Sequence, residues 1–139
     1  AFYMTPAIEL DELVSAVSFS PWPIGHKSAF VEYARRPGDF AIVGVASLVD
    51  VASDGIIHQA TICVSGMGAA PVRCTATEEL LIGTKPDEIS LRVAAETCRE
   101  LDAMEDVHAS PSYRQHLAVE LVSRAVQAAL DDAGAGSTS

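Results

Sequence analysis

The sequence predicts an α+β domain in which an antiparallel sheet of about four strands precedes a cluster of three helices. Residues 14–65 alternate between apolar and polar side chains or run apolar between turn residues, which is typical of hairpin-connected strands. From Thr75 onward the apolar residues instead repeat every three to four positions, which is typical of helices. Because the strand patterns all come before the helix patterns, a segregated α+β arrangement is favoured over alternating βαβ units.

The totals describe one ordinary folded domain. The 139 residues are 49% hydrophobic and 20% charged, and a chain of this length can bury roughly two thirds of its unfolded surface. The formal net charge of −10 disfavours nucleic acid or an anionic membrane as a partner. No apolar run approaches the ~20 residues of a membrane helix. We expect one domain over residues 1–133 and a disordered tail over residues 134–139.

The cysteines and the start of the chain bear on its environment. Cys63, Cys74 and Cys98 are far apart and odd in number, which favours buried, reduced thiols in a cytoplasmic protein over a disulfide framework or a zinc site. No signal-peptide pattern occurs. The chain opens on apolar residues without an initiator methionine, which suggests a piece of a longer protein or an expressed fragment.

Four segments are predicted as strands. After a short apolar stretch at residues 1–6 and a turn or single helical turn at residues 8–13, strand patterns cover residues 14–19, 27–34, 40–51 and 56–65. Pro21 and Pro23 end the first strand because proline has no amide hydrogen to donate. Asp54-Gly55 predicts a tight hairpin between the last two. The more buried face of the last strand is expected to carry Ile56, Ala60, Ile62 and Val64, and the opposite face Ile57.

Three helices are predicted in the second half. Residues 75–78 have the capping-box spacing, and Gly83 ends a helix of about two turns. Asp87 is placed to cap a second helix that ends near residue 102, and Ser110-Pro111 starts the third. The expected core residues are Ile89, Val93 or Ala94, Cys98 and Leu101 in the second helix and Tyr113, Leu117, Leu121, Ala125 and Ala129 in the third.

Arg35, Arg36 and Asp39 are the candidate functional residues. The turn at Pro37-Gly38 brings them together, because proline pre-sets φ and glycine accepts a positive φ. They precede the apolar run at residues 40–51, and charged groups beside a buried element are a common place to meet a cofactor or partner. A surface turn with a local Arg–Asp pair accounts for the same residues.

Other chemistries find little support in the sequence. None of the four histidines is spaced with another histidine or a cysteine as metal ligands are. Gly66-Met67-Gly68 lacks the third glycine of a phosphate-binding loop, and Ser65 lacks the preceding glycine of a G-x-S-x-G elbow. A hydrolase remains an alternative only if substitution of Ser65 or His116 abolishes a measured activity.

Five motifs, in order, resemble the C-terminal domain of the FAD-binding medium subunit of molybdenum hydroxylases, which include carbon monoxide dehydrogenase and xanthine dehydrogenase. Residues 33–43 resemble its R-R-x-x-D-[FI]-A signature, and residues 11–19 resemble its first strand. Residues 66–73 and 78–83 resemble G-G-V-A-x-x-P-x-R and E-x-x-L-x-G, and residues 112–125 resemble its closing helix. The resemblance covers roughly residues 5–132.

This resemblance implies an electron-transfer domain that covers an FAD held mainly by preceding FAD-binding domains and does no catalysis alone. It implies partner subunits that carry 2Fe-2S clusters and molybdopterin. It places Arg35, Arg36 and Asp39 near the flavin and Val14 in contact with it. Glu32 stands at the position of a lysine that commonly contacts the flavin in the family, and it departs from that pattern. A carboxylate there would repel a reduced anionic flavin instead of attracting it. The alternative is a stand-alone interaction domain that kept the fold and lost FAD.

Overall fold

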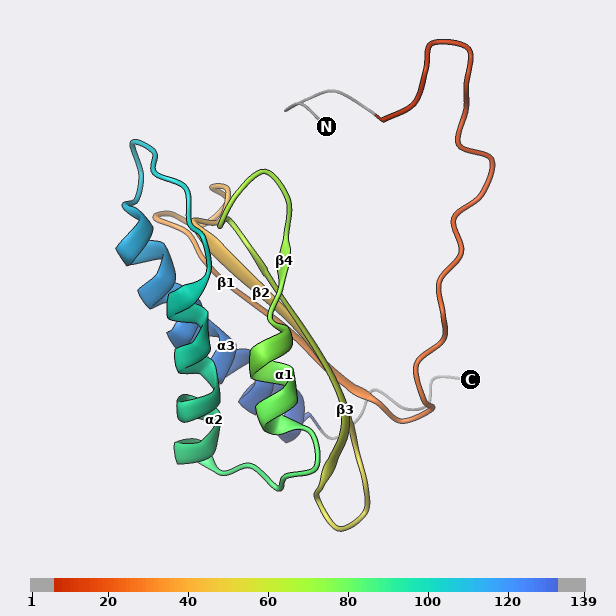
Figure 1. Cartoon of the computed structure of the whole chain (residues 1–139), viewed down its shortest axis with the longest axis vertical. Helices are drawn as coiled ribbons and strands as arrows, with labels where there is room; N and C mark the ends of the chain where they lie inside the picture. The colour runs from red at the N-terminus through yellow and green to blue at the C-terminus, as the bar shows by residue number, and fades with distance from the viewer. Residues whose placement is uncertain (1–6, 133–139) are drawn as a thin grey trace.

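The computed structural model describes residues 7–132 and shows a four-stranded antiparallel sheet with the helices gathered on one face (Figure 1). The strands are β1 (Lys27–Tyr33), β2 (Val43–Val51), β3 (Ile57–Ser65) and β4 (Val72–Arg73), and they lie in the order β1-β2-β3-β4. The helices are α1 (Thr75–Leu81), α2 (Glu88–Ala95), the 3-10 helix η1 (Glu96–Glu100) and α3 (Pro111–Asp131). The predicted α+β class is confirmed. The predicted apolar start at residues 1–6 and the whole predicted tail at residues 134–139 lie outside the described residues.

The predicted first strand at residues 14–19 is wrong. Residues 7–26 contain no strand and run as a coil away from the sheet (Figure 1). Their large apolar side chains are exposed, including Leu10, Val14 and Phe19. Alternation produces a strand only where a partner strand takes up its hydrogen bonds, and β1 pairs with β2. The fourth place in the sheet belongs to β4, whose two residues are too few to show a pattern.

The β2–β3 hairpin is confirmed, and a bulge within it changes which residues face the core. The Ala52 amide donates to the Ile56 carbonyl at 2.9 Å and closes the turn. Asp50 pairs with Gln59 but Val51 pairs with Ile57, so His58 is the extra residue of a β-bulge. The bulge reverses the alternation, and Ile57 is fully buried with Ala60. The prediction that Ile57 faces the less buried side is therefore wrong.

α1 begins without the predicted capping box. Cys74 occupies the N-cap position and makes no side-chain cap hydrogen bond. The carboxylate of Glu78 accepts from the Ile62 amide at 2.8 Å and from the Arg73 Nε at 3.0 Å. Glu78 therefore supplies the acceptor that the short strand β4 does not provide to this part of β3, and it is not free to cap its own helix.

α2 begins as predicted but faces the core with a different stripe. The Asp87 carboxylate accepts from the Ser90 amide at 2.8 Å, which confirms the predicted cap. Ile89 is 74% exposed, so its assignment to the core is wrong. Of the alternatives Val93 and Ala94, Ala94 is buried and Val93 is 63% exposed, and the predicted core position of Cys98 is confirmed. The helix carries two apolar stripes, and the one that faces α1 and α3 consists of Leu91, Ala94, Ala95 and, in η1, Cys98.

α3 crosses β1 and β2 and forms the centre of the core. Ser110 accepts from the Tyr113 amide at 3.3 Å and Pro111 is the first helical residue, as predicted. The Ser47 hydroxyl of β2 donates to the Ala125 carbonyl at 2.9 Å, which joins helix and sheet inside the core. The predicted stripe is confirmed at Leu117, Leu121, Ala125 and Ala129, whereas Tyr113 is exposed and its assignment to the core is wrong. Within residues 7–132, no helix has the length and apolarity needed to cross a bilayer.

Candidate functional site

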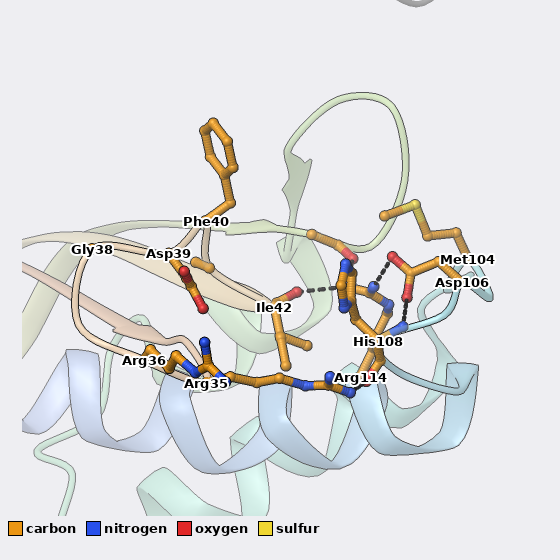
Figure 2. A pocket seen from close by; sticks show the side chains of 12 residues that line it. Arg35, Arg36, Gly38, Asp39, Phe40, Ile42, Met104, Asp106, His108 and Arg114 are labelled. Atoms are coloured by element: carbon orange, nitrogen blue, oxygen red, sulfur yellow. Dashed lines mark hydrogen bonds and ion pairs between the residues drawn. The ribbon is translucent and has the colours of Figure 1, made fainter.

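A pocket of about 780 Å³ opens where the β1–β2 loop (residues 34–42) meets the loop before α3 (residues 101–110) (Figure 2). Its rim and floor come from the β1–β2 loop and, more than sixty residues later in the sequence, from the loop before α3 together with the start of α3. The β1–β2 loop contributes Arg35, Arg36, Asp39 and Phe40, the loop before α3 contributes Met104, Asp106 and His108, and α3 contributes Arg114.

The turn in the β1–β2 loop has the predicted form. The Asp39 amide donates to the Arg36 carbonyl at 3.1 Å, and Gly38 has a φ of 89°, as the third position of a type II turn requires. The Ile42 amide donates to the Tyr33 carbonyl at 2.7 Å and closes the base of the loop. The structure thus brings Arg35, Arg36 and Asp39 together on one exposed rim. Among the ion pairs of the described residues, none joins either arginine to Asp39.

Arg35 connects the two loops that form the rim. Its Nη2 donates to the His108 carbonyl at 2.8 Å. Figure 2 shows Arg35 extending along the pocket toward His108, while Phe40 points away from the other labelled side chains. Arg35 therefore links the two loops by a direct hydrogen bond, and Arg36 adds a second exposed cation beside it.

Arg114 forms the floor of the pocket. It is only 2% exposed, and its Nη1 donates to the carbonyls of Ile42 at 2.6 Å and Gly66 at 2.8 Å. Its Nη2 donates to Asp106 Oδ2 at 2.6 Å. The Nε of Arg114 is buried and has no hydrogen-bond partner within the described part of the chain.

Asp106 organises the loop before α3. Its Oδ1 accepts from the amides of His108 and Ala109, each at 2.9 Å, while its Oδ2 accepts from Arg114. The backbone amide of His108, then that of Ala109 and the Arg114 guanidinium, lower the pKa of Asp106 to about 2. Asp106 is therefore ionised at neutral pH and keeps the pocket floor electrically balanced.

Sequence reasoning assigned no role to Arg114 or Asp106, although a signal for Arg114 exists. Arg114 lies four residues after the Ser110 N-cap. A cation in the first turn of a helix is disfavoured by the helix dipole. Such a residue therefore indicates a compensating partner, which here consists of two carbonyls and a carboxylate. Asp106 offers no comparable signal, because an aspartate in a loop is ordinary.

Two of the predicted site residues lie outside this pocket. Ala29 and Val31 of β1 pack against the core, so Glu32 points to the opposite, exposed face of the sheet. Val14 lies in the exposed coil of residues 7–26. Neither residue lines the pocket.

The pocket combines exposed cations with apolar side chains and is suited to a polar, planar or anionic group. Arg35 and Arg36 offer guanidinium donors, and Phe40 and Met104 offer apolar contact area. Within residues 7–132, no cluster of three or more His, Cys, Asp or Glu side chains is arranged to hold a metal ion.

Known proteins with similar sequences and folds include flavoprotein subunits. Residues 28–129 match the family described as the CO dehydrogenase flavoprotein C-terminal domain. The chain is 35% identical, over 120 residues, to 6-hydroxypseudooxynicotine dehydrogenase complex subunit alpha of Paenarthrobacter nicotinovorans. This alignment covers 86% of this chain and 40% of that protein. The chain is also 37% identical, over 131 residues, to caffeine dehydrogenase subunit beta of Pseudomonas sp. (strain CBB1). This alignment covers 89% of this chain and 42% of that protein.

A solved structure shares the fold. Reconstituted CO dehydrogenase from Oligotropha carboxidovorans superposes with a TM-score of 0.73 and 26% sequence identity, over 80% of this chain and 39% of that chain. The present chain thus spans about two fifths of the length of the relatives it matches.

Proposed function

The chain belongs to the CO dehydrogenase flavoprotein C-terminal domain family, and we propose that it covers the FAD of a medium subunit in a molybdenum hydroxylase-type oxidoreductase. The observation that carries this proposal is the pocket formed by the Arg35–Asp39 turn in a domain of this family. FAD would supply the redox chemistry, and the protein would tune it through nearby charges. Alone, the chain would catalyse no reaction.

The size and lining of the pocket support a contact with one edge of a flavin ring. Its volume of about 780 Å³ lies within the roughly 300–1,000 Å³ that is usual for small-molecule sites. Arg35 and Arg36 would stabilise negative charge that develops on the reduced ring, and Asp39 would orient the arginines. The buried Nε of Arg114, unpartnered among the described residues, would leave one more donor at the floor.

The coil of residues 7–26 supports a contact with preceding FAD-binding domains. Its exposed large apolar side chains are Ile8, Leu10, Leu13, Val14, Val17, Phe19 and Ile24. Exposed apolar groups in this number are typical of a surface that another protein part covers. In our proposal Val14 reaches the flavin through this contact. Glu32, on the other face of the sheet, would not touch FAD.

We further propose the partners and location that this assignment brings with it. A small subunit with 2Fe-2S clusters and a large subunit with molybdopterin would pass electrons to the FAD, in the cytoplasm. Similarity to a protein named as subunit alpha of a dehydrogenase complex supports an assembly of this kind.

The distribution of FAD between this chain and a preceding domain tests the proposal. The chain alone should bind no stoichiometric FAD when incubated with it and desalted. A chimera in which the chain replaces the matching part of caffeine dehydrogenase subunit beta should retain FAD and shield it from collisional quenchers of flavin fluorescence. Stoichiometric FAD with a shifted spectrum on the isolated chain would contradict the proposal. A folded chimera that leaves its FAD unshielded would instead support an interaction domain that lost the flavin.

A further inference from the structure

Two buried cysteines meet outside the candidate site, where the start of α1 contacts η1. Cys74 is the N-cap residue of α1 and Cys98 lies within η1; they are 4% and 1% exposed. Their Sγ atoms are 3.9 Å apart. The third cysteine, Cys63, lies on β3 and is partly exposed.

The separation of the two sulfurs is suited to a disulfide bond. A disulfide requires about 2.05 Å between the sulfurs, so the Cys74 and Cys98 Sγ atoms must approach by less than about 2 Å. A small rotation about the Cα–Cβ bond of one or both residues moves the sulfurs by this amount. The two cysteines come from separate elements, and a bond between them would join α1 to η1.

A small cavity borders the two cysteines. It has a volume of about 140 Å³ and is lined by both cysteines together with Arg73, Thr75, Thr97 and Glu100. A water molecule occupies roughly 30 Å³ in the liquid. A cavity of this size therefore admits hydrogen peroxide, which is only slightly larger than water, but not a protein oxidant.

Hydrogen bonds make one of the two thiols the more reactive. The Thr77 Oγ1 lies 3.7 Å from the Cys98 Sγ. The interaction with Cys74, and further ones with Thr77 and Thr97, lower the pKa of Cys98 to about 7 despite its burial. The same pairing raises the pKa of Cys74. Cys98 is therefore the thiolate that attacks, and Cys74 is the thiol that resolves.

We propose that Cys74 and Cys98 form a reversible disulfide when the protein meets hydrogen peroxide or another small hydroperoxide. In the first step the Cys98 thiolate attacks one peroxide oxygen, the O–O bond breaks, and Cys98 sulfenic acid and hydroxide form. In the second step the Cys74 sulfur attacks the Cys98 sulfur, the S–O bond breaks and water leaves. Together two thiols and one peroxide give one disulfide and two waters, and a dithiol such as dithiothreitol reverses the bond.

Intact mass and peptide mapping of the full chain test this proposal. The protein is treated with hydrogen peroxide, quenched with catalase, denatured in N-ethylmaleimide and weighed. Because the chain has three cysteines, the untreated protein should take up three maleimides. The treated protein should take up one, at Cys63, and a tryptic map should contain a Cys74–Cys98 cross-linked peptide. Treatment with dithiothreitol before alkylation should restore the uptake of three maleimides.

Two variants separate this pair from other oxidation. Cys63→Ser should still lose both of its remaining thiols. The Cys74→Ser variant should form no intramolecular disulfide, so it should lose no thiols in that way. It should instead form a Cys98 sulfenic acid that dimedone traps. If Cys74→Ser does not fold, the map of the wild type and the Cys63→Ser variant still decide the matter. Three maleimides after peroxide, a cross-link through Cys63, or only intermolecular disulfides would overturn the proposal. None of these readouts depends on FAD.

Discussion

Asp106 and Arg114 form an ion pair at the floor of the pocket, with 2.6 Å between Oδ2 and Nη2. The same arginine donates to the carbonyls of Ile42 and Gly66, and the same aspartate accepts from two amides of its own loop. One buried side chain therefore joins the β1–β2 loop, the end of β3 and the loop before α3. The exposed residues of the rim depend on this buried connection for their relative positions.

Replacing Arg114 should destabilise the whole domain. Arg114→Met leaves two carbonyls and the Asp106 carboxylate without their donor, so we expect a loss of about 3 kcal/mol in the free energy of unfolding. Arg114→Lys should cost less, because its single nitrogen keeps the charge but reaches fewer of the partners. Arg124→Met on the exposed side of the same helix is the control and should change stability by less than about 0.5 kcal/mol. Urea unfolding measures all three; equal stability of Arg114→Met and Arg124→Met would refute the connection.

The contribution of Asp106 should disappear in acid. Its pKa in the folded protein is lowered to about 2 by the His108 amide first, then by Ala109 and Arg114. A lowered folded pKa means that the stabilisation is complete above the ordinary aspartate value of about 4 and is lost as the pH falls from there toward 2. Wild type should thus exceed Asp106→Asn in free energy of unfolding at pH 6, and the difference should shrink below pH 4. A difference that stays constant from pH 6 to pH 2.5 would show that the ionised form is not what stabilises the loop.

Gly66 should tolerate no side chain. Its φ is +85°, and a Cβ would lie 2.1 Å from the Ile42 carbonyl oxygen, which Arg114 also contacts. We expect Gly66→Ala to cost more than about 2 kcal/mol, since the strained backbone and the clash with main-chain atoms add together. Gly68→Ala, where a Cβ meets nothing within 4 Å, is the matched control and should be close to neutral. Thermal unfolding of the pair measures the contrast, and similar melting temperatures would contradict the close backbone approach.

Glu78 should behave as part of the sheet and not as a helix cap. Glu78→Ala removes the acceptor of the Ile62 amide, and leaving a buried amide unpaired should cost about 2 kcal/mol. Glu79→Ala, at the exposed neighbouring position of the same helix, should change stability by less than about 0.5 kcal/mol. Amide hydrogen exchange provides the specific readout, because Ile62 should lose protection in Glu78→Ala alone. Unchanged protection at Ile62 would contradict this role.

The elements that local chemistry determines were predictable from the sequence. The Pro37-Gly38 turn, the Asp54-Gly55 hairpin and the Asp87 and Ser110 caps each depend on residues within a few positions of one another, and all are present. The same turn predicted that Arg35, Arg36 and Asp39 lie together, and they do.

The remaining features depend on distant partners that a local pattern does not contain. Glu78 has capping-box spacing, but it bonds to the Ile62 amide sixteen residues away. Ile89 and Val93 of α2 are exposed because the helix packs against α3 with its other stripe, which contains the small residues Ala94 and Ala95. The floor of the site depends on Arg114 reaching carbonyls 48 and 72 residues away. The contacts of Arg35, Arg36, Asp39 and Val14 with FAD, and the lack of such a contact at Glu32, stay predictions.

The midpoint potential of FAD in the chimera with caffeine dehydrogenase subunit beta tests the proposed flavin contact most directly. If Arg35 and Arg36 lie beside the ring, they stabilise its reduced anionic form, so the double variant Arg35→Gln/Arg36→Gln should lower the potential by about 30 mV or more, equivalent to about 1.4 kcal/mol. The control Arg92→Gln/Arg124→Gln removes the same charge outside the pocket and should leave the potential unchanged. A potential that is equal in both double variants would contradict the placement of this rim beside the flavin.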